Sequence, residues 1–201
     1  MKKILILLFL IYPAVLEAQI FNRNVSKTGT VAATFLEIPV GASAIGMGGA
    51  FVSVAADASA LYWNAAGIAS MQQMEFMAQH TNWLAGTGFD YAALILPLSG
   101  IGTFGFSFTS LNMPDMKVTT VDMPQGTGEF FSAGDMAVGV SYAMSLTDRF
   151  SIGFNAKYIQ QKIWHETASG FAVDFSTLFR TDLLNGLIIG AAISNFGTSM
   201  Q

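Results

Sequence analysis

The chain has 201 residues, of which 52% are hydrophobic and only 11% are charged. Soluble domains usually carry ~25% charged residues, so this composition disfavours an ordinary soluble domain and also a disordered chain. The net charge of −4 argues against a nucleic-acid-binding protein, which needs a basic surface. Because the chain has no cysteine, it has no disulfide, thiolate metal site or cysteine nucleophile.

The first residues form a candidate export signal. Met1–Lys3 is a short basic start, Ile4–Val15 is apolar, and Leu16–Ala18 ends on a small residue. This order of segments is typical of a secretory signal peptide. A buried helix or a membrane anchor is the alternative, which is disfavoured because the apolar stretch is short and contains Pro13. We expect residues 1–18 to be removed and the remainder to be exported.

Residues 19–71 are predicted to form an N-terminal extension and a hatch, or plug. Small residues dominate two stretches, GASAIGMGGAF over Gly41–Phe51 and AADASALYWNAAG over Ala55–Gly67, and small side chains let backbones approach closely. The run GMGG also fits part of a dinucleotide-binding loop. Such a loop needs a third glycine and a downstream acid within a βαβ unit, and the sequence offers no such unit.

Local helix signals lie within the second stretch. Asp57 is expected to cap a short helix over residues 58–63. Asn64 and Gly67 suit the C-terminal turn of that helix.

From Gln72 onward the pattern changes to alternation with a period of two, which places successive side chains on opposite faces of a strand. For example, Phe104, Phe106 and Phe108 are separated by glycine and serine. One face of each predicted strand is therefore large and apolar, and the other is small or polar. The predicted strands are Gln72–Leu84, Phe89–Leu98, Ile101–Leu111, Asp135–Leu146, Arg149–Trp164, Gly170–Thr181 and Gly186–Phe196.

This alternation has two explanations. A soluble sandwich buries the apolar face against a second sheet, whereas a transmembrane barrel turns that face to lipid and the small, polar face to its lumen. The barrel is favoured by segment lengths near the ~9–11 residues that cross a bilayer, by the low charge of the second face, and by the export signal. We predict an all-β fold, a transmembrane antiparallel β-barrel over residues 72–201, in contact with lipid of the cell outer membrane.

The predicted connections differ in length at the two ends of the strands. Residues 97–100, 145–148 and 183–186 are short turns, the last with an Asn-Gly pair that favours positive φ. Residues 112–134 and 165–169 are longer polar links. Since outer-membrane barrels have short periplasmic turns and long external loops, we place the long links outside.

Seven predicted strands is an odd number, whereas single-chain bacterial barrels normally have an even number of eight or more. We therefore expect the chain to be the N-terminal half of a longer barrel. Phe89–Leu98 is apolar on both faces, so its inner face is expected to pack on the plug. In Arg149–Trp164 the alternation fails after Tyr158, which predicts a bulge or an extension beyond the membrane.

Several residues are candidates for function. Lumen-facing candidates on the small, polar face are Glu75, Lys157, Asp174 and Arg180. They form either a charge network that stiffens the wall or a path for a solute or peptide. Phe130 and Phe131, beside an acidic outer loop, are candidates for anchoring a partner or lining a ligand entrance.

The sequence offers no enzyme constellation. The two histidines, His80 and His165, have no second His or Cys at metal-ligand spacing, and we interpret them as loop or interface residues. We expect no enzymatic activity, cofactor, metal or nucleic-acid partner. Aromatic residues that suit the membrane–water interface are Trp83, Trp164, Tyr91, Tyr142 and Tyr158.

The glycine-rich segment resembles the PorV/PorQ family of outer-membrane proteins, which are similar to FadL-type transporters. The family commonly shows a Gly-rich motif, then an Asp, then Asn-Pro-Ala-Gly. Matching positions are Gly46, Gly48, Gly49, Asp57, Trp63, Asn64, Ala66 and Gly67, and Ala65 stands where proline is usual. The resemblance is specific to this segment, and the strands match only by their alternation.

The resemblance implies a FadL-like barrel of about fourteen strands with the N-terminal segment folded inside as a partly helical hatch. It also implies two functions. PorV-like relatives act in type IX secretion, where they receive cargo proteins from the translocon and hand them to the surface attachment machinery. FadL-like proteins pass hydrophobic small molecules through the outer membrane. We expect a type IX secretion or surface attachment component, with hydrophobic uptake as the alternative.

Overall fold

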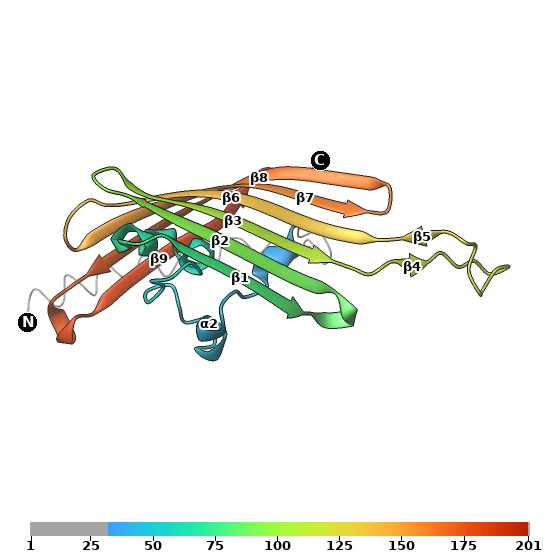
Figure 1. Ribbon diagram of the computed structural model, residues 1–201, viewed down its shortest axis with the longest axis horizontal. Helices are drawn as coiled ribbons and strands as arrows, with labels where there is room; N and C mark the ends of the chain where they lie inside the picture. The colour runs from blue at the N-terminus through green and yellow to red at the C-terminus, as the bar shows by residue number, and fades with distance from the viewer. Residues whose placement is uncertain (1–31, 201) are drawn as a thin grey trace, which may run out of the picture. The chain divides into compact units, whose positions relative to one another are not determined.

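A computed structural model describes residues 32–200, and its main feature is one antiparallel sheet of seven strands in the order β1-β2-β3-β6-β7-β8-β9 (Figure 1). The strands are β1 (Glu75–Asn82), β2 (Gly88–Leu98), β3 (Gly102–Asn112), β6 (Ala133–Ser145), β7 (Phe150–Ile163), β8 (Glu166–Arg180) and β9 (Ile188–Gly197). The predicted mostly-β, antiparallel fold is confirmed. The predicted signal peptide, residues 1–18, lies outside the described residues.

The connection between β7 and β8 differs from the expectation. A longer link over residues 165–169 was predicted, and this prediction is wrong. Ile163 pairs with Glu166, so the turn consists of Trp164 and His165 alone, with Trp164 at φ 53°. The residues after the turn are small or polar, so they carry no apolar face. The ladder of backbone hydrogen bonds nevertheless continues through them, which alternation of side chains does not reveal.

The loss of alternation after Tyr158 corresponds to an extension of the strand and not to a bulge. The pairing of β7 with β8 runs without a register shift as far as Ile163. The irregularity in this region of the sheet lies instead where β8 pairs with β9, between Val173 and Phe175. A bulge there changes which residue of β9 faces Asp174.

The predicted long link over residues 112–134 contains a second, smaller ladder. β4 (Met116–Lys117) pairs with β5 (Phe130–Phe131). We call residues 113–132 the hairpin arm. It continues the direction of β3 and β6 and projects past the ends of the other strands (Figure 1).

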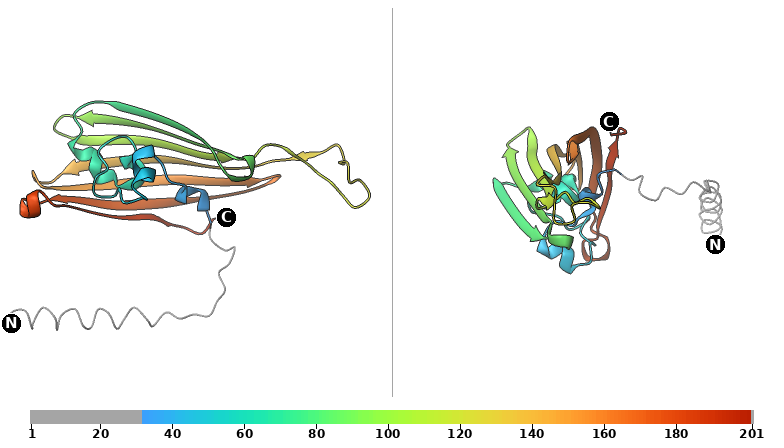
Figure 2. Two further views of the ribbon diagram at one scale, coloured as in Figure 1. Left: turned by 90° about the horizontal axis from the view of Figure 1, so that it is seen from below. Right: turned by 90° about the vertical axis from the view of Figure 1, so that its right-hand side faces the viewer.

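Residues 32–71, which we call the hatch, fold into short helical turns on the concave side of the sheet (Figure 2). The turns are η2 (Thr34–Glu37), α2 (Ala42–Gly46), α3 (Ala60–Trp63) and η3 (Ala65–Ser70). Two more turns, η4 (Leu84–Gly86) and η5 (Leu183–Asn185), connect strands, and Asn185 and Gly186 have the predicted positive φ. None of the helices in residues 32–200 combines the length and the apolar character needed to cross a membrane.

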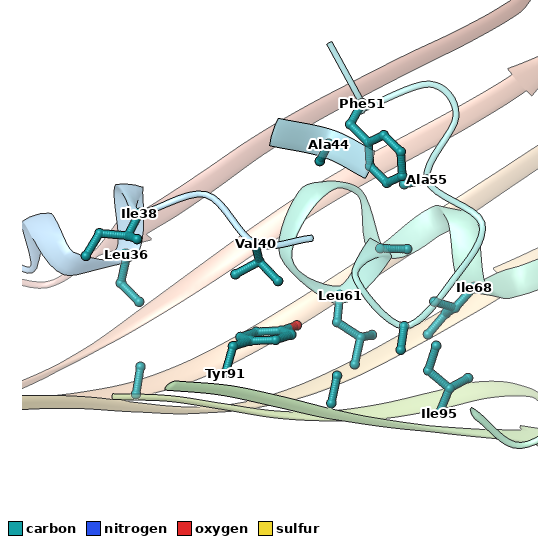
Figure 3. Close-up of a cluster of buried hydrophobic side chains, with 14 of the residues drawn as sticks. Leu36, Ile38, Val40, Ala44, Phe51, Ala55, Leu61, Ile68, Tyr91 and Ile95 are labelled. Carbon is teal, nitrogen blue, oxygen red and sulfur yellow. The ribbon is translucent and has the colours of Figure 1, made fainter. Parts of the chain in front are cut away.

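The apolar core lies between the hatch and the inner face of β2 (Figure 3). Leu61 and Ile68 of the hatch face Tyr91 and Ile95 of the strand. The inner face of β2 therefore packs on the N-terminal segment, as its apolar character on both faces predicted. The expectation that Tyr91 lies at a membrane interface is wrong, because its position in the alternation points it inward, where it is 3% exposed.

Truncation of this core should weaken the whole fold. Ile68 is fully buried, so Ile68→Ala should lower the free energy of unfolding by ~2–5 kcal/mol through the cavity it leaves. The same truncation at Ile163, which is exposed, should change it by less than ~0.5 kcal/mol. Denaturant titration of both variants measures the difference. Equal losses would contradict the assigned core.

Candidate functional site

The hatch sits where the concave face lacks side chains. A Cβ atom at Gly105 would lie 2.4 Å from the Leu61 side chain, and one at Gly153 would lie 2.3 Å from the Ala66 backbone nitrogen. A Cβ atom at Gly190 would lie 2.6 Å from the Val52 carbonyl oxygen of the hatch. We call these three the seat glycines, because a larger residue at any of them would displace the hatch. Sequence analysis missed them, although they lie on the small face of alternating strands.

The glycines of the motif have different reasons for being glycine. Gly49 has φ 83° and lies against the ring of Trp63, with 3.6 Å between its Cβ position and Cη2. Gly46 and Gly48 have nothing within 4 Å of their Cβ positions, and Gly48 has φ 63°. The close approach expected from small residues therefore does not occur at these two positions. Gly48 is required by its backbone conformation.

The turn before α3 is fixed by Asp57. Its Oδ1 accepts hydrogen bonds from the backbone N–H of Ser59 at 2.9 Å and from the Ser59 hydroxyl at 2.5 Å. The regular helix begins only at Ala60 and is shorter than the predicted span of residues 58–63. After α3 the chain folds back so tightly that a Cβ atom on Gly67 would lie 2.1 Å from the Ala55 carbonyl oxygen.

Asn64 joins two turns of the hatch to the sheet. The residue is 2% exposed. Its Oδ1 accepts a hydrogen bond from Ala66 N–H at 3.0 Å, and its Nδ2 donates to the carbonyl oxygens of Val52 at 2.8 Å and Thr177 at 3.0 Å. Since every polar atom of this amide is used, its role is structural.

Two aromatic residues next to Asn64 tie the hatch together. The indole N–H of Trp63 donates to the Val40 carbonyl at 2.8 Å, and the Tyr62 hydroxyl donates to the Leu36 carbonyl at 3.0 Å. Burial, and secondarily the negative charge of Glu37, raises the pKa of Tyr62 to about 12. The hydroxyl therefore remains a donor at neutral pH.

Two of the four predicted lumen-facing charges contact the hatch. Glu75, at the start of β1, accepts a hydrogen bond from the Ala58 N–H at 2.8 Å. Arg180, at the end of β8, donates to the Ser70 hydroxyl at 3.3 Å. Both side chains therefore face the concave side and contact the hatch at two different points.

The other two charges form a buried pair. Lys157 Nζ lies 2.7 Å from Asp174 Oδ2, and the two side chains are 13% and 11% exposed. Asp174 also accepts hydrogen bonds from the Asn195 N–H at 2.7 Å and from Asn155 Nδ2 at 3.1 Å. Because Asn195 lies beside the bulge, the irregular pairing of β8 and β9 completes this cluster. Lys157, Asp174, Asn155 and Asn195 thus form one network of charged and amide groups on the concave face.

The remaining candidates lie on the hairpin arm, on the convex face or in the β7–β8 turn. Phe130 is 55% exposed on the hairpin arm, and Phe131 beside it is half-buried. On the convex face, Nδ1 of His80 lies 2.6 Å from Oδ1 of Asp90. In the β7–β8 turn, the ring of His165 lies against the ring of Trp164. Among residues 32–200, no group of three or more His, Cys, Asp or Glu is placed to hold a metal ion.

The chain matches one known protein family over most of its length. Residues 11–162 match the Uncharacterised protein family (UPF0164). The chain belongs to this family. The UPF0164 match contains the whole hatch, all of β1, β2, β3 and β6, and nearly all of β7. No curated protein matches the chain.

In this UPF0164 protein, the two kinds of motif glycine should respond differently to the same methyl group. Gly67→Ala forces the Ala55 carbonyl to move and should destabilise the hatch by ~1–3 kcal/mol. Gly46→Ala meets open space and should be neutral or slightly stabilising. Limited proteolysis within residues 32–71 measures opening of the hatch. Equal protection of the two variants would show that Gly67 does not hold it.

Proposed function

We propose that the sheet forms the wall of a transmembrane β-barrel in a bacterial outer membrane. The supporting observation is the convex face, where large apolar side chains are exposed row after row. Phe106 is 44% exposed, Phe154 is 43% exposed and Phe175 is 49% exposed. Along β7 this face runs from Phe150 to Tyr158, close to the ~9–11 residues of a tilted membrane strand. Lipid is the solvent that suits such a surface.

The upper limit of the apolar band supports the same proposal. At the end of the strands that carries the hairpin arm, the next row on the convex face is polar on every strand except β6, and it consists of His80, Asp90, Ser110, Met136, Gln160 and Ser169. A sharp change from phenylalanine to polar residues across neighbouring strands is expected where hydrocarbon meets head groups. A soluble sandwich would need a second sheet over the convex face, and none of the described residues forms one.

The proposal predicts that the folding free energy lost to an arginine on the convex face depends on its depth in the membrane. Phe106→Arg, in the middle of the band, should cost ~2–4 kcal/mol of folding free energy in lipid vesicles, whereas Gln160→Arg, in the polar row, should cost ~0–1 kcal/mol. Reversible unfolding of the protein from vesicles measures both values. Equal costs at the two positions would contradict a lipid-facing convex side.

For the biological role, we propose a component of type IX protein secretion or surface attachment that binds protein partners through the hairpin arm. The arm exposes four apolar side chains by 50–98%, namely those of Met116, Val121, Met123 and Phe130. Apolar residues gathered on a projection are typical of an interaction site. The PorV/PorQ-like motif of the hatch is the second support, and cargo proteins and translocon subunits are the proposed partners.

A second candidate is a channel for hydrophobic small molecules, as in FadL-like proteins. The specific observation in its favour is the hatch itself, which covers the concave face between β2 and β8. A plug inside a wall is a means of controlling passage. Apart from the apolar inner face of β2, many concave-face positions are small or polar, such as Ser141, Gly153 and Asp174, so this part of the sheet offers such molecules few apolar contacts.

Complementation of a deletion strain separates the two roles. Phe130→Ser on the arm should reduce the set of proteins displayed at the cell surface, measured by surface proteolysis and mass spectrometry. Leu184→Ser is the matched control, since Leu184 is 85% exposed at the opposite end of the strands and should leave display unchanged. Uptake of a fluorescent fatty acid should be normal in both strains. A deletion strain that is normal in display and in uptake would leave neither role standing.

A further inference from the structure

A small polar cavity lies between the hatch and the sheet. Its volume is about 20 Å³, and its polar lining residues are Tyr62, Tyr91, Ser107, Thr109, Asn155 and Lys157. Leu36, Leu61, Ala137 and Gly139 complete the lining, so the polar groups lie beside apolar ones in this part of the hatch contact.

Two buried polar atoms that belong to the cavity's lining residues have no hydrogen-bond partner among the described residues. They are the hydroxyl of Tyr91, which is 3% exposed, and Oδ1 of Asn155, which is 2% exposed. The other end of the Asn155 amide is occupied, because Nδ2 donates to Asp174. A buried polar atom left unpaired costs ~1–3 kcal/mol, and such atoms are normally satisfied.

The volume and polar lining of the cavity indicate which molecule fits it. A single water needs roughly 10–15 Å³ of this kind of volume and two to four polar neighbours, so the space suits one or two waters and nothing larger. Gly139 creates the space, because a Cβ atom there would lie 2.5 Å from Ser107 Oγ and 3.0 Å from Asn155 Oδ1. The one charged lining residue, Lys157, is neutralised by Asp174, so the cavity offers no unpaired charge for an ion.

We propose that one or two ordered water molecules occupy this cavity and link the Tyr91 hydroxyl to Asn155 Oδ1. The contact between hatch and sheet then includes a hydrated site. This inference stands on the cavity and its two unpaired atoms, and it does not depend on the proposed membrane location or role.

X-ray hydroxyl-radical footprinting of the intact protein tests the proposal, because radicals form from bound water beside the residue they label. Tyr91, which is 3% exposed, should be labelled several-fold faster than Phe89, which is 0% exposed and lies two residues earlier on the same face of β2. Gly139→Ala places a methyl group in the cavity and should reduce Tyr91 labelling toward the Phe89 rate, whereas Gly46→Ala should not. Wild-type Tyr91 labelled no faster than Phe89 would overturn the proposal.

Thermal unfolding gives an independent readout that needs no cavity-filling variant. In a hydrated site, Tyr91→Phe removes a hydrogen bond to water and should lower the Tm. In a dry site the same change removes an unpaired hydroxyl, and the Tm should stay the same or rise. An unchanged or higher Tm would therefore also overturn the proposal.

Discussion

The close approach of the hatch backbone to the concave face is the constraint on which the rest of the structure depends. At Gly153 the two backbones meet with no room for a methyl group. Short helical turns leave many backbone N–H groups without partners inside the turn. Because the hatch lies so close to the sheet, side chains of the sheet can accept hydrogen bonds from these groups. Glu75 and Gln79 of β1 accept hydrogen bonds from the hatch N–H groups of Ala58 and Gly41, each at 2.8 Å. Side chains of the sheet therefore complete the hydrogen bonding of the hatch backbone.

The alternation of the strands serves two environments at once. Along β3, Gly105 and Ser107 face the hatch, while Phe106 and Phe108 face outward. A slip of one residue in the register would exchange these faces and place a phenylalanine ring where Leu61 packs. The same period that makes the convex face apolar therefore also leaves space for the hatch, so each face fixes the register for the other.

Alternation is a local signal, and for this reason the strands and their faces were predictable from the sequence. Contacts that depend on distant residues were not. Lys157 and Asp174 could be placed on the small face, but their pairing follows from the register of β7 with β8. Gly48 and Gly67 belong to one motif, yet only the folded chain distinguishes a glycine with positive φ from one pressed against a carbonyl.

The direction of the two edge strands restricts how this sheet can be closed. Every neighbouring pair from β1 to β9 is antiparallel, so the edge strands of this seven-stranded sheet point the same way. Direct contact between them would be a parallel pair. An all-antiparallel cylinder that contains this sheet must therefore include an odd number of further strands. A second copy supplies an odd number, but it fits only upside down, which would put the two hairpin arms on opposite sides of a membrane.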